Sequence, residues 1–164
     1  MMTIVQSAGN FQSVTPGIWR ADWVWGLPLI VLTVIIHVFG LGIMNVRAAR
    51  VFSRMERHHP TVVFALVMGT ATLLASILHA VEAVIWAVSY QLVGAQSDYK
   101  SAMLYSMGAM TTFGHAGVFL EDRWQLMGAI EALSGWLLFG LTTAFLFGMI
   151  HKLGRQAAEQ VTKK

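Results

Sequence analysis

A short polar stretch, residues 110–117 with the sequence MTTFGHAG, lies between two long apolar segments of this chain. Threonine hydroxyls and loop backbone carbonyls are oxygen donors, and rings of such carbonyls can replace the hydration shell of a cation. Glycine lets the backbone adopt conformations that other residues resist. The stretch is therefore a candidate cation-coordinating loop.

Four ionisable side chains lie inside apolar segments, where they are costly unless they meet a partner or water. His79 and Glu82 are three residues apart, so they share one helix face and can hydrogen-bond each other. We expect this pair to anchor its segment to the short helix before the candidate loop, and His37 to be a helix-packing residue. With Glu131 these side chains could ligate a metal, although only His79 and Glu82 have a spacing that supports it.

The composition is that of an integral membrane protein. Of 164 residues, 56% are hydrophobic and 12% are charged, and the mean hydropathy is +0.62. A soluble domain carries roughly one-quarter charged residues. There is no cysteine, which excludes disulfides and thiolate metal sites. The net charge of +3 comes mostly from residues at segment ends, which is no indication of nucleic-acid binding.

Three segments are long enough to cross a bilayer as helices, and a fourth is not. Residues 23–44, 61–93 and 124–150 each exceed the roughly 20 residues that a spanning helix needs. Residues 102–113 are apolar, but at about 1.5 Å per residue they cover only about 18 Å of a core about 30 Å thick. We expect this segment to enter the membrane and return to the same side.

The basic residues predict the orientation. They are concentrated between the first and second spans and after the third, which the positive-inside rule assigns to the cytoplasm. The N-terminus and the short segment are then outside. The cytoplasmic basic residues are Arg47, Arg50, Arg54, Arg57, Lys152, Arg155, Lys163 and Lys164.

From residue 61 to about 151 the chain resembles the potassium channel pore family, in its small bacterial branch with an extra N-terminal span. The stretch TTFGHAG falls without a gap on that family's TTVGYGD filter, and WQLMGAIEALSGWLLFGLTTAFLF is similar to the start of its inner helix. The resemblance implies an all-α membrane protein, with three transmembrane helices, a re-entrant pore helix and a filter loop in each subunit of a homotetramer. The expected parts are an N-terminal tail 1–22, a first span 23–45, a basic loop 46–60, a pore domain 61–151 (outer helix 61–93, pore helix 101–111, filter 111–117, inner helix 124–151) and a tail 152–164.

The expected function is passive conduction of monovalent cations, with K⁺ the expected ion, in a bacterial inner membrane. No enzyme activity, other cofactor, nucleic acid or soluble ligand domain is expected; the partners are further copies of the chain and the bilayer. The filter residues implied by the resemblance are Thr111, Thr112, Phe113, Gly114, His115, Ala116 and Gly117.

The filter departs from the family at three positions. His115 replaces a tyrosine, Ala116 a glycine and Gly117 an aspartate. Alanine in a left-handed conformation costs roughly 1–2 kcal/mol. The alternatives are a weakly selective or non-conducting relative and, from another class, a membrane redox or metal-binding protein. His115 is expected either to sense pH near the outer mouth or to pack behind the filter.

Five further residues have expected supporting roles. The resemblance implies that Glu131 lies behind the pore helix, where it can bond the N–H groups of the filter loop. Thr142 and Thr143 are candidates to line the cavity, although threonines in helices also bond their own backbone. Gly135 and Gly140 are candidate gate hinges or positions of close helix packing.

Overall fold

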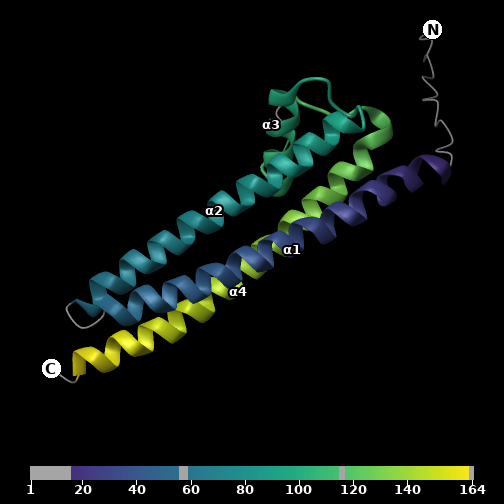
Figure 1. The fold of residues 1–164 in the computed structure, drawn as a ribbon. Helices are drawn as coiled ribbons and strands as arrows, with labels where there is room; N and C mark the ends of the chain where they lie inside the picture. Colours follow the sequence, from purple (N-terminus) through teal and green to yellow (C-terminus); the bar gives the residue numbers. More distant parts are fainter. Residues whose placement is uncertain (1–15, 56–58, 115–116, 163–164) are drawn as a thin grey trace, which may run out of the picture.

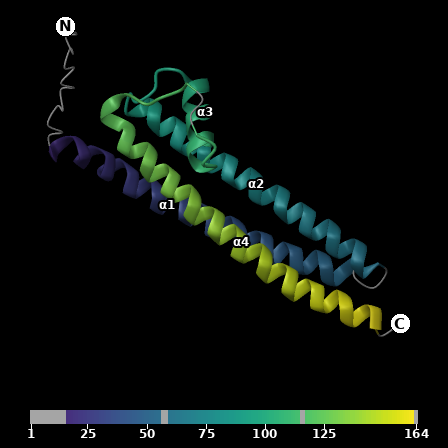
Figure 2. The ribbon, with the colours of Figure 1, turned by 180° about the vertical axis from the view of Figure 1, so that it is seen from behind.

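The computed structural model describes residues 16–55, 59–114 and 117–162, and all regular structure in these ranges is helical. Three long helices run side by side along one axis, and a short helix lies against one end of them (Figure 1). The view from behind shows the same arrangement (Figure 2). The elements in chain order are α1 (Pro16–Met55), α2 (Pro60–Leu92), α3 (Tyr99–Met110), the 3₁₀ turn η1 (Asp122–Trp124) and α4 (Gln125–Thr162).

Helices α1, α2 and α4 are long and apolar enough to cross a membrane. Their candidate spans contain 36, 33 and 38 residues, with mean hydropathies of 2.5, 2.2 and 1.7 in their most apolar windows. Large apolar side chains stay exposed along all three, among them Phe39, Leu66 and Phe139. The prediction of an all-helical chain with three such helices is confirmed.

The long helices extend beyond the predicted spans. Helix α1 already includes residues 16–22 of the expected tail and continues to Met55, into the expected loop 46–60. Helix α4 continues to Thr162 through most of the expected tail 152–164. The helices are longer than the predicted spans because hydropathy marks what can lie in lipid, whereas helical hydrogen bonding continues through good helix formers such as alanine, arginine and glutamine.

The segment that contains α3 leaves one end of the molecule and returns to it. Gly94, at φ +72°, follows the end of α2 and turns the chain. Two hydrogen bonds then join the segment before α3 to the segment after the loop. The Glu121 N–H donates to the Ala95 carbonyl (3.2 Å), and Gln96 Nε2 donates to the Phe119 carbonyl (2.6 Å). Residues 95–121, which we call the excursion, therefore begin and end side by side.

Helix α3 begins with a side-chain cap. The Asp98 carboxylate accepts hydrogen bonds from the Ser101 backbone N–H (2.8 Å) and hydroxyl (2.9 Å). This cap satisfies one of the free N–H groups of the first turn. The bonds from Ser101 also lower the pKa of Asp98 below its ordinary value of 3.8.

The largest core cluster holds α3 between α2 and α4. Trp86 and Tyr90 of α2 are fully buried, and the ring of Tyr105 on α3 meets Tyr90 edge-on, with 5.5 Å between ring centroids. Glycines let α4 approach closely: a Cβ at Gly128 would lie 2.0 Å from the Tyr105 hydroxyl, and one at Gly135 would lie 2.6 Å from the Met110 carbonyl oxygen. The position of α3 is thus fixed by aromatic packing on one side and close backbone contact on the other.

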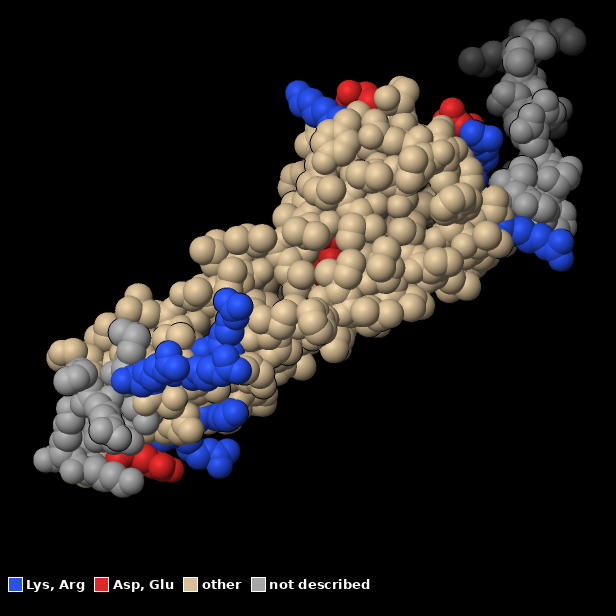
Figure 3. Space-filling view, in the orientation of Figure 1, with Lys and Arg blue, Asp and Glu red and all other residues tan. Residues whose placement is uncertain are grey.

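Most charged side chains of the visible face lie toward the two ends of the molecule, and few appear in its middle (Figure 3). Basic residues dominate the end where α1 approaches α2 and α4 terminates, whereas both signs occur at the α3 end (Figure 3). This distribution suits helices whose central parts lie in lipid. The basic residues described at the first end are Arg47, Arg50, Arg54, Lys152 and Arg155.

Candidate functional site

The loop after α3 begins in an unusual backbone conformation. Thr112 has φ +57° and Gly114 has φ +91°. Thr112 N–H donates to the Ala109 carbonyl (3.1 Å) and Gly114 N–H to the Gly108 carbonyl (3.3 Å), so both donors point back at α3. A β-branched residue rarely adopts positive φ, and the conformation costs roughly 1–2 kcal/mol. Such strain concentrates at ligand-binding segments.

The described residues of this loop are exposed in the single chain. Thr111, Thr112, Phe113 and Gly114 are all exposed, and Phe113 retains 85% of its accessible surface. Thr111 Oγ1 donates to the Met107 carbonyl (2.6 Å). The loop is therefore held by α3 rather than by packing from the rest of the chain, and an exposed phenylalanine at this position is an apolar surface that a partner could cover.

The end of α3 lies deep along α4. Gly135, against which the Met110 backbone packs, is ten residues after the start of α4, about 15 Å at 1.5 Å per residue. That distance is half of a bilayer core about 30 Å thick. The C-terminal end of a helix carries partial negative charge, and α3 has no basic residue in its last turn to offset it.

Glu131 joins α4 to both α2 and α3. Its carboxyl group is fully buried and lies within hydrogen-bonding distance of the Tyr90 and Ser106 hydroxyls. Ser106 Oγ also lies 2.8 Å from the Ala83 carbonyl. The residue lies behind α3, but in the described part of the chain its partners are these hydroxyls and not loop N–H groups as expected. The reason is that Glu131 meets α3 at Ser106, which lies four residues, about one turn, before the helix ends at Met110.

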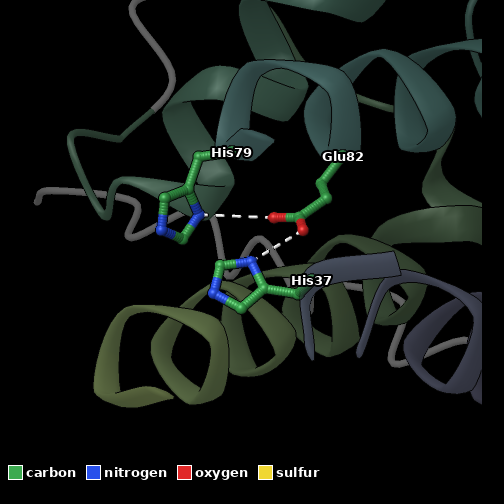
Figure 4. A group of neighbouring side chains, drawn as sticks. All are labelled: His37, His79 and Glu82. Atoms are coloured by element: carbon green, nitrogen blue, oxygen red, sulfur yellow. Dashed lines mark hydrogen bonds and ion pairs between the residues drawn. The ribbon is translucent and has the colours of Figure 1, made fainter. Parts of the chain in front are cut away.

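A second polar cluster joins α1, α2 and α4. Figure 4 shows its members from α1 and α2, which are His37, His79 and Glu82. His37 Nδ1 lies 2.8 Å from Glu82 Oε1, and His79 Nδ1 lies 3.4 Å from Glu82 Oε2. The other ring nitrogens of both histidines lie within hydrogen-bonding distance of Thr142 Oγ1. His37, His79 and Glu82 each offer one atom that can bind a metal ion, and these three atoms all lie within 4.8 Å of one another.

This second cluster corrects two expectations. The pair His79 and Glu82 does not anchor α2 to α3, because both side chains meet His37 of α1 and Thr142 of α4 instead. His37 is more than a packing residue, since it bonds at both ring nitrogens while fully buried. The fourth residue proposed as a metal ligand, Glu131, belongs to the separate network with Tyr90 and Ser106.

The remaining predicted residues lie apart from these clusters. Thr142 is buried in the second cluster, whereas Thr143 is exposed and donates to the Phe139 carbonyl of its own helix (2.9 Å). Gly135 is a close contact with α3, and Gly140 has open space beside it. Both glycines lie within the continuous helix α4. Gly117, at φ +77°, is exposed, and His115 and Ala116 lie outside the described residues.

Sequence reasoning missed several polar partners. Tyr90 and Ser106, which bond Glu131, carry no mark that separates them from other residues of their type. Asp22 was also missed: it is fully buried on α1 and accepts a hydrogen bond from the Met127 N–H in the first turn of α4 (3.0 Å). The available signal was a lone carboxylate near the start of an apolar segment, which requires a partner.

Comparison with protein-family models, with curated proteins and with solved structures gives no match to this chain. The class that the fold defines is an all-helical chain with three helices able to cross a membrane and a short helix packed among them at one end.

Proposed function

We propose that this chain is a subunit of a cation channel, similar to the pore domain of potassium channels. The observation that carries the proposal is the closed excursion between α2 and α4: a 12-residue helix too short to span, followed by a loop with positive φ at Thr112 and Gly114. Non-helical backbone is tolerated at membrane depth only where protein buries it or where it lines a water-filled cavity.

The electrostatics of α3 favour a cation beside this loop. The negative end of the helix dipole lies ten residues, about 15 Å, into α4 from its start, next to the exposed loop. Loop carbonyls can then complete the coordination of a dehydrated ion. Conduction is passive, because a pore of this kind needs only a gradient of the permeant ion.

Conduction requires several copies of the chain around one axis. A single loop supplies one column of carbonyls, whereas a coordinating cage needs a ring of them. The exposed Phe113, Trp136 and Phe139 provide apolar surface near the loop for contacts between copies. We propose a homotetramer with closed cyclic symmetry.

The proposed selectivity is weaker than that of the family. Ala116 and Gly117 stand where the family has glycine and aspartate, which alters the outer carbonyl ring and removes a ring of carboxylates. K⁺ is the proposed main ion, and Na⁺ is expected to pass as well. A non-conducting relative is the alternative that the experiment below distinguishes.

The test is cation flux through the purified full-length chain in liposomes, with K⁺ and Na⁺ gradients measured separately. We expect flux in the wild type and its loss in Gly114→Ala, because alanine resists φ +91°. The matched control is Gly69→Ala on α2, where a Cβ meets no atom within 4 Å and no positive φ is required.

Ala116→Gly/Gly117→Asp is the variant that tests selectivity. We expect its ratio of K⁺ to Na⁺ flux to exceed that of the wild type. A wild type and a Gly69→Ala control that conduct neither ion, with flux appearing only in the double variant, would identify the non-conducting alternative. Flux that survives Gly114→Ala unchanged would remove the loop from the pathway.

A further inference from the structure

Two imidazoles and one carboxylate converge between α1 and α2, far from the loop in sequence (Figure 4). His37 and Glu82 are fully buried, and the side chain of His79 is 27% exposed. Among the described residues, Glu82 forms ion pairs only with these two histidines. No arginine or lysine of the described residues neutralises the carboxylate.

Glu82 has an oxygen that the cluster does not satisfy. Oε1 has a hydrogen bond from His37, but the buried Oε2 has none and faces His79 Nδ1 at 3.4 Å. A buried carboxylate oxygen without a hydrogen bond is costly in an apolar environment. This atom therefore points to an additional cation between the carboxylate and the imidazoles.

Counting hydrogens leads to the same conclusion. The cluster has four polar contacts, two between Glu82 and the imidazole Nδ1 atoms and two between Thr142 Oγ1 and the Nε2 atoms. Two neutral imidazoles and one hydroxyl supply only three hydrogens, and an ionised carboxylate supplies none. The three hydrogen bonds use all three, so no hydrogen is left for the contact between His79 Nδ1 and Glu82 Oε2 unless the cluster holds one more cation.

We propose that His37, His79 and Glu82 form a binding site for a divalent transition-metal ion such as Zn²⁺. The ligands are the two Nδ1 atoms and the Glu82 carboxylate. Both imidazole hydrogens then lie on Nε2 and are donated to Thr142 Oγ1, at 2.9 and 3.1 Å, and a hydroxyl oxygen can accept both. The imidazole nitrogens and the carboxylate oxygens of the cluster are all satisfied in this arrangement.

The donor set matches the chemistry of such ions. Zinc sites with two histidines, one carboxylate and an open fourth position are well established, and imidazole also suits Cu, Fe and Ni. Metal-bound histidines usually donate their other N–H to an oxygen that fixes the ring, which is the place of Thr142 here. The absence of cysteine agrees with a site built from nitrogen and oxygen alone.

An ion can reach the site from the side of His79. This residue lines a cavity of about 550 Å³ together with Ser76, Met110 and Thr112. Because Thr111 and Thr112 also line this cavity, the proposed site opens toward the loop that follows α3. The site itself consists of other residues, and its occupation does not depend on conduction.

The test is metal binding by the full-length chain, purified without an affinity tag, reconstituted in lipid nanodiscs, stripped with a chelator and dialysed against Zn²⁺ or Co²⁺. We expect one ion per chain by elemental analysis, and a Co²⁺ absorption spectrum typical of nitrogen and oxygen ligands in a four-coordinate site. We also expect Zn²⁺ to raise the thermal unfolding temperature of the wild type, because the ion binds the folded chain.

Variants assign the ligands. His79→Gln and Glu82→Gln should weaken Zn²⁺ binding more than 10-fold, and Thr142→Val, which keeps the side-chain shape, by about 10–100-fold. The matched control is His58→Gln/His59→Gln, which removes another pair of histidines and should leave binding unchanged. A variant that fails to fold does not spoil the test, because the wild type alone shows whether an ion binds.

Two results would overturn the proposal. One is a wild type that binds no ion, which would make an additional proton the cation of the cluster. The other is binding that the ligand variants and Thr142→Val leave unchanged, which would assign the ion to another site. Both results are independent of flux, so they are distinguishable from a failure of the channel proposal.

Discussion

Glu131 is buried among hydroxyl groups in a way that indicates its protonation state. Ser106 carries a single hydroxyl hydrogen but lies within bonding distance of both the Ala83 carbonyl and Glu131. If the hydroxyl donates to the carbonyl, the contact with Glu131 needs a hydrogen from the carboxyl group. The arrangement therefore suits a neutral carboxylic acid, which is also the form that costs least to bury.

Glu131→Gln tests this interpretation at the level of a single residue. Glutamine is neutral and can donate to Ser106 while accepting from Tyr90, so we expect it to leave the thermal stability nearly unchanged. Glu131→Ala should destabilise the chain by roughly 1–3 kcal/mol for each hydroxyl left without a partner. The measurement is thermal unfolding in detergent. If Glu131→Gln destabilised the chain as much as Glu131→Ala, the interpretation of Glu131 as a neutral carboxylic acid would be wrong.

Asp98 makes a second prediction at this scale, on the pH dependence of stability. Its pKa is lowered in the folded chain by the bonds from Ser101, so its contribution is full above the unfolded pKa and is lost as the pH falls through the lowered value. We expect stability to decrease below about pH 4. In Asp98→Asn, which keeps a capping side chain without this titration, the decrease should be smaller. The measurement is the unfolding temperature of the wild type and of Asp98→Asn from neutral to acidic pH. Identical pH profiles of the two proteins would exclude this role for Asp98.

At the scale of elements, the contact between α3 and α4 depends on a missing side chain. A Cβ at Gly135 would lie 2.6 Å from the Met110 carbonyl oxygen and 2.7 Å from its Cα, and backbone atoms cannot rotate away. At Gly140, one and a half turns further along α4, a Cβ meets nothing within 4 Å. The two glycines therefore have different roles in the same helix.

Gly135→Ala and Gly140→Ala are a matched pair for this contact. We expect Gly135→Ala to destabilise the chain by about 1–3 kcal/mol, because the end of α3 must move. Gly140→Ala should leave stability equal or raise it by up to about 1 kcal/mol, since alanine is the better helix former. Thermal unfolding compares the two. A flux defect in Gly140→Ala at normal stability would support its role as a gate hinge, whereas equal stability of both variants would contradict the packing assignment of Gly135.

The sequence was sufficient for the long helices but not for their partners. Apolar runs predicted the three helices able to cross a membrane, and a 12-residue apolar run predicted the short one. Contacts of α1 were not predictable, because His37 meets Glu82 45 residues later and Thr142 105 residues later. Spacing along one helix shows only neighbours on that helix, such as His79 and Glu82, and the packing of separate helices decides the rest.

At the scale of the whole molecule, the distribution of charge predicts the orientation in the membrane. The end where α1 and α4 terminate is mainly basic, which by the positive-inside rule lies in the cytoplasm (Figure 3). By the same rule the α3 end is predicted to face outward, so the excursion is predicted to enter the membrane from the outer side. If all three long helices cross the membrane, the two ends of the chain lie on opposite faces.

Single cysteines can test this orientation because the native chain has none. Ser97→Cys, exposed before α3, should react with a membrane-impermeant maleimide in intact cells. Ser53→Cys, exposed near the end of α1, should react only after the membrane is permeabilised. The reverse pattern would invert the topology, and with it the side from which ions meet the loop.

The bond between His37 and Thr142 also constrains how the chain is made. Helix α1 leaves the ribosome first, whereas Thr142 is translated 105 residues later, roughly 5–20 s at about 5–20 residues per second. During that interval the imidazole of His37 has no partner on α4, and a polar group alone in lipid is costly. We therefore expect α1 to remain beside the insertion machinery, or at the membrane surface, until its partners on α2 and α4 emerge.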